Sequence, residues 1–140
     1  MNNNTPPISV TRQKIIPGAK QYIQSKSPLF PYTLVFEDDS RTGLLYAVEM
    51  CKQKPSIIDA VRLYSCIPSQ KILSYEIYFL WTLDGFKAAC VIDSKYSMIF
   101  DFKSKYGFIS PNTMGCFSQW TKHQSAWQAE AIVGFSDFLP

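Results

Sequence analysis

The densest group of chemically capable side chains in the sequence is the run Glu37, Asp38 and Asp39, followed closely by Arg41. Carboxylates can ligate hard cations such as Ca²⁺, or they can form ion pairs with a basic partner. The run lacks the alternating ligand spacing of an EF-hand, and Asp is common in turns without any metal, so we predict no metal site. Two interpretations remain open. The run is either an acidic recognition loop, in which Arg41 holds one carboxylate and the others face a partner, or a solvated hairpin tip.

The sequence offers little support for catalysis. The single histidine, His123, has no evident partner, whereas nucleophilic catalysis needs a nucleophile activated by a base. We find no phosphate-binding loop, dinucleotide-binding glycine motif, nucleophile elbow or zinc-protease motif. The four cysteines include no close pair and have no neighbouring histidine, which argues against a zinc site. The sequence therefore favours a protein without catalytic residues or a cofactor, but it leaves enzyme activity open.

A second possible site is aromatic. Trp81, Trp120 and Trp127 could line a pocket for a small ligand or a substrate, with Asp84 or Asp101 as its polar anchor. Trp120 and Trp127 are seven residues apart and would share one face of a helix. The plainer interpretation is that the three tryptophans pack together in the core against a sheet.

A third possibility is single-stranded nucleic acid, because lysines alternate with aromatic residues late in the chain. The residues concerned are Lys87, Lys95, Tyr96, Phe102, Lys103, Lys105 and Tyr106. Lysines on strand edges also prevent aggregation between edges. The net charge is only +3, and no two Lys or Arg residues are adjacent, so the sequence argues against a nucleic-acid partner.

Composition predicts one ordered domain. The chain has 140 residues, of which 46% are hydrophobic and 15% aromatic, and aromatic residues favour β-structure. Residues 1–10 lack the charged and apolar regions of a signal peptide, and no segment approaches the length of about 18 apolar residues that spans a bilayer. We expect a cytoplasmic protein with no membrane partner and with reduced cysteines.

Residues 1–31 are rich in Asn and Pro, so we expect a poorly ordered N-terminal segment with at most a short element near 20–24. A single α+β domain would then occupy 32–140. Its first two strands, 32–37 and 44–51, would be joined by the acidic turn, with Gly43 best suited to a positive φ. Ser56 and Asp59 have the spacing of a helix N-terminus and predict a helix over 56–66.

The clearest pattern is the strict alternation of apolar residues over 73–83, which predicts a strand with one buried face. Asp84-Gly85 predicts a two-residue type I′ hairpin turn. The resulting register pairs Leu83 with Phe86, Trp81 with Ala88, Phe79 with Cys90 and Ile77 with Ile92. A third strand, 96–102, would bury the same face only if a three-residue loop precedes it.

A last strand, 106–110, and a helix from Ser118 to about Ile132 complete the expected fold. The predicted fold class is α+β: an antiparallel meander sheet of five or six strands, with one inserted helix and a C-terminal helix packed on the sheet.

Several motifs follow one another in the order found in a known family. They are Val35-Phe36-Glu37-Asp38-Asp39, Thr42-Gly43, Tyr46-Ala47, Ile58-Asp59-Ala60, Leu63-Tyr64, Trp81, Asp84-Gly85, Lys87-Ala88-Ala89, Phe100-Asp101-Phe102, Tyr106-Gly107 and the two late tryptophans. Together they resemble the bacterial domain of unknown function 2251 family of uncharacterised proteins. The resemblance runs from about residue 35 to 127, and it implies a small single-domain protein with no assigned activity.

We expect from these observations a small, non-enzymatic, cytoplasmic protein-binding module that uses the acidic loop. A toxin-neutralising immunity protein is one form such a module could take. The alternative is a small-ligand-binding protein or enzyme with an aromatic-lined pocket, and single-stranded nucleic-acid binding is third. The protein would be a monomer or a small homo-oligomer.

Overall fold

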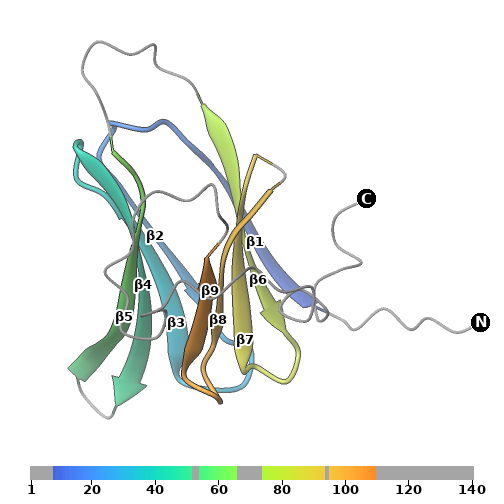
Figure 1. Cartoon of the computed structure of the whole chain (residues 1–140). Coiled ribbons are helices and arrows are strands. Elements are labelled where there is room, and N and C mark those ends of the chain that lie inside the picture. The colour runs from blue at the N-terminus through green and yellow to red at the C-terminus, as the bar shows by residue number, and fades with distance from the viewer. Residues whose placement is uncertain (1–7, 52–53, 66–73, 94, 110–140) are drawn as a thin grey trace, which may run out of the picture.

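The structure, a computed structural model, describes residues 8–51, 54–65, 74–93 and 95–109, and within these ranges every regular element is a β-strand (Figure 1). The strands form two antiparallel sheets. The first sheet has, in spatial order, β1 (Ile8–Ile15), β6 (Tyr75–Thr82), β7 (Lys87–Ile92), β8 (Lys95–Asp101) and β9 (Tyr106–Ile109). The second has β2 (Gln21–Lys26), β3 (Tyr32–Asp38), β4 (Thr42–Cys51) and β5 (Lys54–Ser65).

The two sheets pack face to face as a β-sandwich, because each contributes alternate apolar side chains to one shared core. The second sheet supplies Ile23, Leu34, Phe36, Leu45, Ala47, Val61 and Leu63. The first supplies Ile15, Ile77, Phe79, Trp81, Ala88, Cys90, Met98 and Phe100. Each sheet is a meander of consecutive strands, and β1 is the exception, since it joins the far edge of the first sheet beside β6.

The prediction of an α+β fold is wrong for the described residues. Residues 56–66, expected to be helical, lie almost entirely in β5, where the side chains of Asp59, Val61 and Leu63 are buried at every second position. The sequence did not reveal this period of two because Asp59 is buried, whereas a carboxylate in a sequence pattern is expected at the surface. The expected C-terminal helix lies outside the described residues. In the ranges that can be inspected, no helix has the length and apolar character to cross a membrane.

The N-terminal part also differs from expectation. Residues 8–26, assigned to a poorly ordered segment, contribute one strand to each sheet. β1 pairs with β6 over its whole length, and β2 pairs with β3. Partners far away in sequence stabilise β1, which explains why its local composition did not reveal it.

The register of the β6–β7 hairpin is confirmed: Ile77 pairs with Ile92, Phe79 with Cys90 and Trp81 with Ala88. The turn type differs from the prediction. A type I′ turn needs positive φ at both central residues, but only Gly85 of the Asp84-Gly85 pair has one, at 80°. Its N–H donates to the Thr82 carbonyl oxygen at 2.8 Å.

The next hairpin achieves the predicted packing by another route. β8 begins opposite the end of β7, with Lys95 paired to Ile92, so the connection is shorter than the three residues expected. A bulge between Cys90 and Val91 then shifts the register by one residue. Met98 pairs with Cys90 and still points into the core. The bulge therefore does what the longer loop was expected to do.

Candidate functional site

The acidic run divides between the end of β3 and a tight turn into β4. Ser40, and not Gly43, takes the left-handed conformation in this turn, with φ of 79°. The Asp39 carboxylate accepts the main-chain N–H groups of Thr42 at 2.9 Å and Arg41 at 2.8 Å. These bonds favour the charged form and hold the pKa of Asp39 below its usual value. Asp39 is therefore an exposed, ionised residue that also fixes the turn.

Asp38 has a different environment, because its side chain is only 2% exposed. Its carboxylate accepts the N–H of Gly18 at 2.9 Å, the N–H of Ser40 at 2.7 Å and the hydroxyl of Tyr64 at 2.5 Å. These donors come from the β1–β2 connection, the β3–β4 turn and β5. Asp38 thus joins three separate segments and is unavailable to a partner.

Gly43 makes the contact between Asp38 and Tyr64 possible. Asp38 pairs with Gly43 on β4, and Gly43 pairs with Tyr64 on β5. A Cβ atom at position 43 would lie 2.4 Å from the Tyr64 ring. The Tyr64 ring therefore crosses β4 over the space left by the missing side chain, and its hydroxyl reaches Asp38. We call these three residues the Asp38 clasp.

The remaining acidic groups face solvent next to the clasp. Glu37 is half-buried and lies opposite Tyr22, whose side chain is 60% exposed. The Tyr46 hydroxyl lies 3.4 Å from Glu37 Oε1, and burial together with the Glu37 charge raises the pKa of Tyr46. An open pocket of about 480 Å³ lies over this surface. Its lining residues are Lys20, Gln21, Tyr22, Glu37, Asp38 and Asp39.

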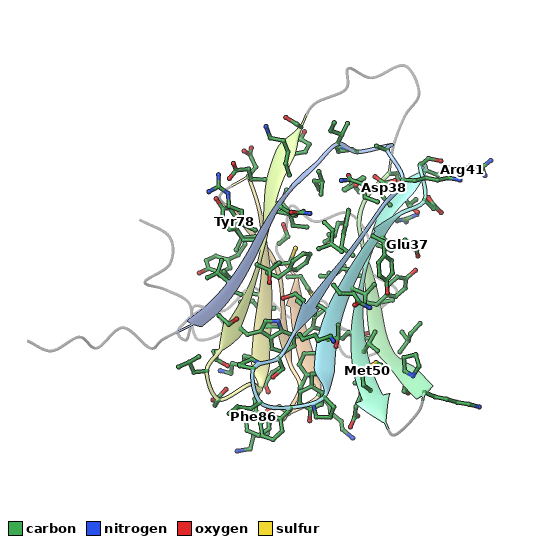
Figure 2. The ribbon with its side chains drawn as sticks, turned by 180° about the vertical axis from the view of Figure 1, so that it is seen from behind. Glu37, Asp38, Arg41, Met50, Tyr78 and Phe86 are labelled. Carbon is green, nitrogen blue, oxygen red and sulfur yellow. The ribbon has the colours of Figure 1, made fainter. Side chains whose placement is uncertain are left out.

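Figure 2 shows Glu37, Asp38 and Arg41 gathered at one end of the sandwich, with Phe86 at the opposite end. Arg41 is exposed and forms no ion pair with a carboxylate of the described residues. The structure thus brings the four predicted residues together but gives them separate roles. Tyr22 and Lys20 belong to the same surface, and sequence reasoning missed them because they lie in the segment expected to be poorly ordered.

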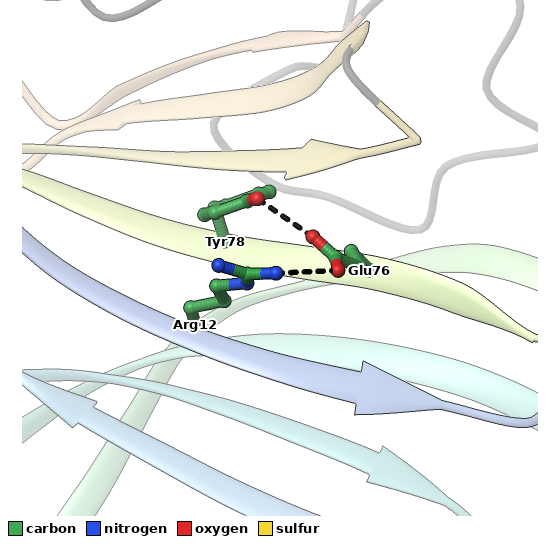
Figure 3. A network of polar contacts seen from close by, with 3 residues as sticks. All are labelled: Arg12, Glu76 and Tyr78. Carbon is green, nitrogen blue, oxygen red and sulfur yellow. Dashed lines mark hydrogen bonds and ion pairs between the residues drawn. The ribbon is translucent and has the colours of Figure 1, made fainter.

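A second cluster of polar side chains, which was not predicted from the sequence, lies on the outer face of the first sheet (Figure 3). Arg12 Nη2 lies 2.7 Å from Glu76 Oε1, and the Tyr78 hydroxyl donates to Glu76 Oε2 at 2.7 Å. The bond from Arg12, and then that from Tyr78, lowers the pKa of Glu76. Both Glu76 oxygens are engaged, so this group offers no free base.

The residues of the aromatic-pocket alternative occupy different environments. Trp81 is fully buried, its Nε1 donates to Ser25 Oγ at 3.0 Å, and its ring stacks on Phe102 with 5.5 Å between centroids. Trp81 therefore contributes no surface to an open pocket. Trp120 and Trp127 lie outside the described residues.

The two proposed polar anchors are turn residues. Asp84 accepts the Thr82 hydroxyl at 2.6 Å and the Phe86 N–H at 3.0 Å, and these bonds lower its pKa in that order of strength. Asp101 accepts the N–H groups of Lys103 and Ser104 in the turn after β8. Both carboxylates therefore accept hydrogen bonds that stabilise their turns.

The aromatic residues of the nucleic-acid alternative are largely covered. Phe102 is 3% exposed, and burial raises the pKa of the half-buried Tyr96 to about 12. Lys103 lies over the Phe86 ring, 5.3 Å from its centroid. The side chains of Lys95 and Tyr106 lie outside what can be described. Phe102 is thus a core residue and cannot stack a base.

The described residues contain no cluster of three or more His, Cys, Asp or Glu side chains that could hold a metal ion. Cys90 is fully buried, and burial raises the pKa of its thiol, which makes a reactive thiolate unfavourable at neutral pH. Among the described residues, the surface best suited to contact another molecule is the one formed by Glu37, Asp39 and Tyr22.

Comparison with known proteins agrees with the resemblance seen in the sequence. The chain is 27% identical over 125 residues to an uncharacterised protein of Haemophilus influenzae, covering 84% of this chain and 76% of the relative. No solved structure matches it. Residues 15–136 match the family described as "Uncharacterized protein conserved in bacteria (DUF2251)", which is most of the chain. The chain therefore belongs to this bacterial family of uncharacterised proteins.

Proposed function

We propose that this protein is a non-enzymatic binding module that recognises a basic side chain of another protein through the surface formed by Lys20, Gln21, Tyr22, Glu37 and Asp39. We call this surface the acidic face. The observation that carries the proposal is the open pocket that joins two solvent-facing carboxylates to the exposed Tyr22. Sites for small ligands bury most of the ligand's surface, whereas this pocket is open, so it is better suited to a protruding side chain of a partner.

The chemistry of the acidic face favours a cationic side chain. Glu37 and Asp39 provide negative charge, and the Tyr22 ring can accept an Arg or Lys through a cation–π contact worth about 0.5–1 kcal/mol at an exposed site. Lys20, which also lines the pocket, adds one opposing charge and would disfavour a partner with a wholly basic surface. A single basic residue is therefore a better match than a basic cluster.

The Asp38 clasp supports recognition by holding this surface in one conformation. Asp38 of the clasp also accepts the Gly18 N–H, which ties the β1–β2 connection, where Lys20 lies, to the end of β3, where Glu37 lies. A surface that is already ordered loses less conformational entropy when a partner binds. The buried Asp38 would thus support Glu37 and Asp39 without contacting the partner.

The test is a pull-down from bacterial lysate with the double variant Glu37→Gln/Asp39→Asn. Gln and Asn keep an acceptor for the Tyr46 hydroxyl and for the turn N–H groups, so the variant removes two charges with little change in structure. The matched control is Asp84→Asn/Asp101→Asn, which removes two turn carboxylates elsewhere. Bound proteins are quantified by mass spectrometry.

A partner retained by wild type and the control, but reduced about tenfold or more in the acidic-face variant, is the expected result. The identity of that partner decides whether the module is of the immunity type. Equal retention by all three proteins, or no specific partner for any of them, would show that the acidic face is not a recognition site.

A further inference from the structure

Among the described residues, β2 is an edge strand of the four-stranded sheet, with β3 on one side and no strand on the other. The Ser27 N–H donates to the Tyr32 carbonyl oxygen at 2.9 Å, which fixes the phase of the hydrogen-bond ladder between β2 and β3. Hydrogen-bonded pairs alternate along an antiparallel ladder. The main-chain groups of Tyr22, Gln24 and Lys26 therefore point away from β3, toward the open edge.

The open edge is available to another strand. Tyr22, Gln24 and Lys26 all have exposed side chains, and their outward main-chain groups have no partner among the described residues. Although β1 precedes β2 in the chain, it pairs with β6 in the other sheet, and Thr11 Oγ1 and Ser25 Oγ, 3.2 Å apart, join the two strands through side chains. An edge with unpaired N–H and C=O groups can accept an extended segment from a second protein.

We propose that an extended segment of another protein, with one basic residue, adds to β2 as a fifth, antiparallel strand of this sheet. The inference rests on the proposed function, because the acidic face lies directly beside this edge: Tyr22 on β2 pairs with Glu37 on β3. Main-chain hydrogen bonds to Tyr22, Gln24 and Lys26 would supply affinity, and the acidic face would supply specificity.

The geometry of the sheet determines where the basic residue must lie. Neighbouring strands are about 4.8 Å apart, so a residue opposite Tyr22 would be about 10 Å from Glu37, two strand spacings away. An extended Arg side chain spans most of this distance and would lie over the Tyr22 ring on the way. The Gln24 side chain donates to the Tyr22 hydroxyl at 2.9 Å and helps to hold the ring in place.

Lys26 sets a second requirement. It lies on the same face of β2 as Tyr22, four residues along, and would pair with an acidic residue of the incoming strand. In an antiparallel arrangement, that acidic residue precedes the basic one by four positions. The preferred segment therefore reads Glu-x-x-x-Arg, with small or β-branched residues between the two charges.

The other edges fit this segment less well. β5 carries Pro55, and its pairing with β4 contains two irregularities, both of which discourage the addition of a strand. β9 extends over only four of the described residues. β1 presents Arg12 and Lys14, and Arg12 is already paired with Glu76 (Figure 3). A basic residue is thus attracted to the edge of β2 and repelled by that of β1.

The experiment titrates the ¹⁵N-labelled protein with the synthetic peptide Thr-Glu-Val-Thr-Val-Arg-Thr, capped at both ends, and follows amide NMR signals. The control peptide has Glu in place of Arg. Gln24→Pro removes the outward N–H without breaking a bond to β3, and Pro is tolerated at such edge positions. Gln24→Ala is the matched variant, since it loses the side chain but keeps the N–H. Glu37→Gln/Asp39→Asn is titrated in parallel.

The expected result is that the Arg peptide, at up to about 1 mM, shifts the amide signals of Tyr22, Gln24 and Lys26 in the wild-type protein. Gln24→Pro and Glu37→Gln/Asp39→Asn each weaken binding about tenfold, whereas Gln24→Ala changes it about twofold or less. The wild-type amide shifts test strand addition even if Gln24→Pro does not fold.

Three results would overturn the inference. If Glu37→Gln/Asp39→Asn weakens binding but Gln24→Pro and Gln24→Ala bind equally, the acidic face recognises a basic residue without strand addition, and only this inference fails. If the wild-type protein does not bind the Arg peptide, the inference also fails, while the lysate experiment judges the proposed function separately. If the same amides shift with protein concentration alone, a second copy of this chain occupies the edge.

Discussion

The Asp38 clasp makes the strongest prediction about stability: replacing Asp38 with Ala should destabilise the protein far more than replacing its exposed neighbour Asp39. Asp38 is 2% exposed and accepts three hydrogen bonds, from Gly18, Ser40 and Tyr64. Asp39 also accepts main-chain bonds, but its donors can be hydrated when it is removed. The two variants remove the same chemical group at adjacent positions, so the difference between them measures burial and partners.

The magnitude follows from the three donors. A hydrogen bond to a charged acceptor contributes about 1.5–3 kcal/mol when its loss leaves a buried group unpaired. Ser40 is exposed, so water can replace most of its bond, whereas Gly18 and Tyr64 are half-buried. Loss of the bonds from Gly18 and Tyr64 should be costly, and loss of the bond from Ser40 should cost little. We therefore expect Asp38→Ala to lower the free energy of unfolding by about 3–5 kcal/mol. Tyr64→Phe, which removes one donor, should cost about 1–2 kcal/mol.

Urea unfolding followed by far-ultraviolet circular dichroism measures these differences at neutral pH. The double variant Asp38→Ala/Tyr64→Phe should be less destabilised than the sum of the single variants by about 1–2 kcal/mol, because the two side chains share one bond. Additive effects, or equal losses for Asp38→Ala and Asp39→Ala, would refute the clasp as a stabilising element.

Three other changes test parts of the fold and of its turns. Gly43→Ala should cost about 2 kcal/mol or more in urea unfolding, because its Cβ would overlap the Tyr64 ring, and much less when Tyr64 is also Ala. Gly85→Ala should cost about 2 kcal/mol, because φ is 80° and the added Cβ would crowd the residue 27–30 loop; a loss near zero would contradict this packing. The hydrogen bond from the Thr82 hydroxyl lowers the pKa of Asp84, so its stabilisation should be present above its ordinary pKa of 3.8 and lost as the pH falls further. Melting temperatures measured from about pH 6 to pH 2.5 should fall less steeply for Asp84→Asn than for wild type.

The hairpins could be predicted from the sequence because residues close together in the chain determine how their strands pair. Alternating apolar residues and Asp84-Gly85 determined the pairing of Phe79 with Cys90 and Trp81 with Ala88, although the turn type differed. The same local reasoning failed for β5. Asp59 is buried among alternating apolar residues, so the strand resembled an amphipathic helix with a capped start.

The two-sheet architecture and the division of the acidic run could not be predicted, because both depend on contacts between distant residues. β1 is a strand because it pairs with β6, 60 to 74 residues later. Nothing near Asp38 in sequence distinguishes it from Glu37 or Asp39. Its donors Gly18 and Tyr64 are 20 and 26 residues away. Their convergence on one carboxylate appears only when β3, β4 and β5 lie side by side.

The roles of the three acids depend on the alternation of side chains along β3. Asp38 points toward the interior, where the space over Gly43 lets Tyr64 reach it, and Glu37 therefore points outward, beside Tyr22. Asp39 follows the last paired residue of β3 and is free to cap the turn. A shift of one residue in register would bury Glu37 and expose Asp38, which would remove the clasp and change the acidic face together. Stability and recognition are thus coupled through the register of one strand, and the Asp38→Ala variant should lose both.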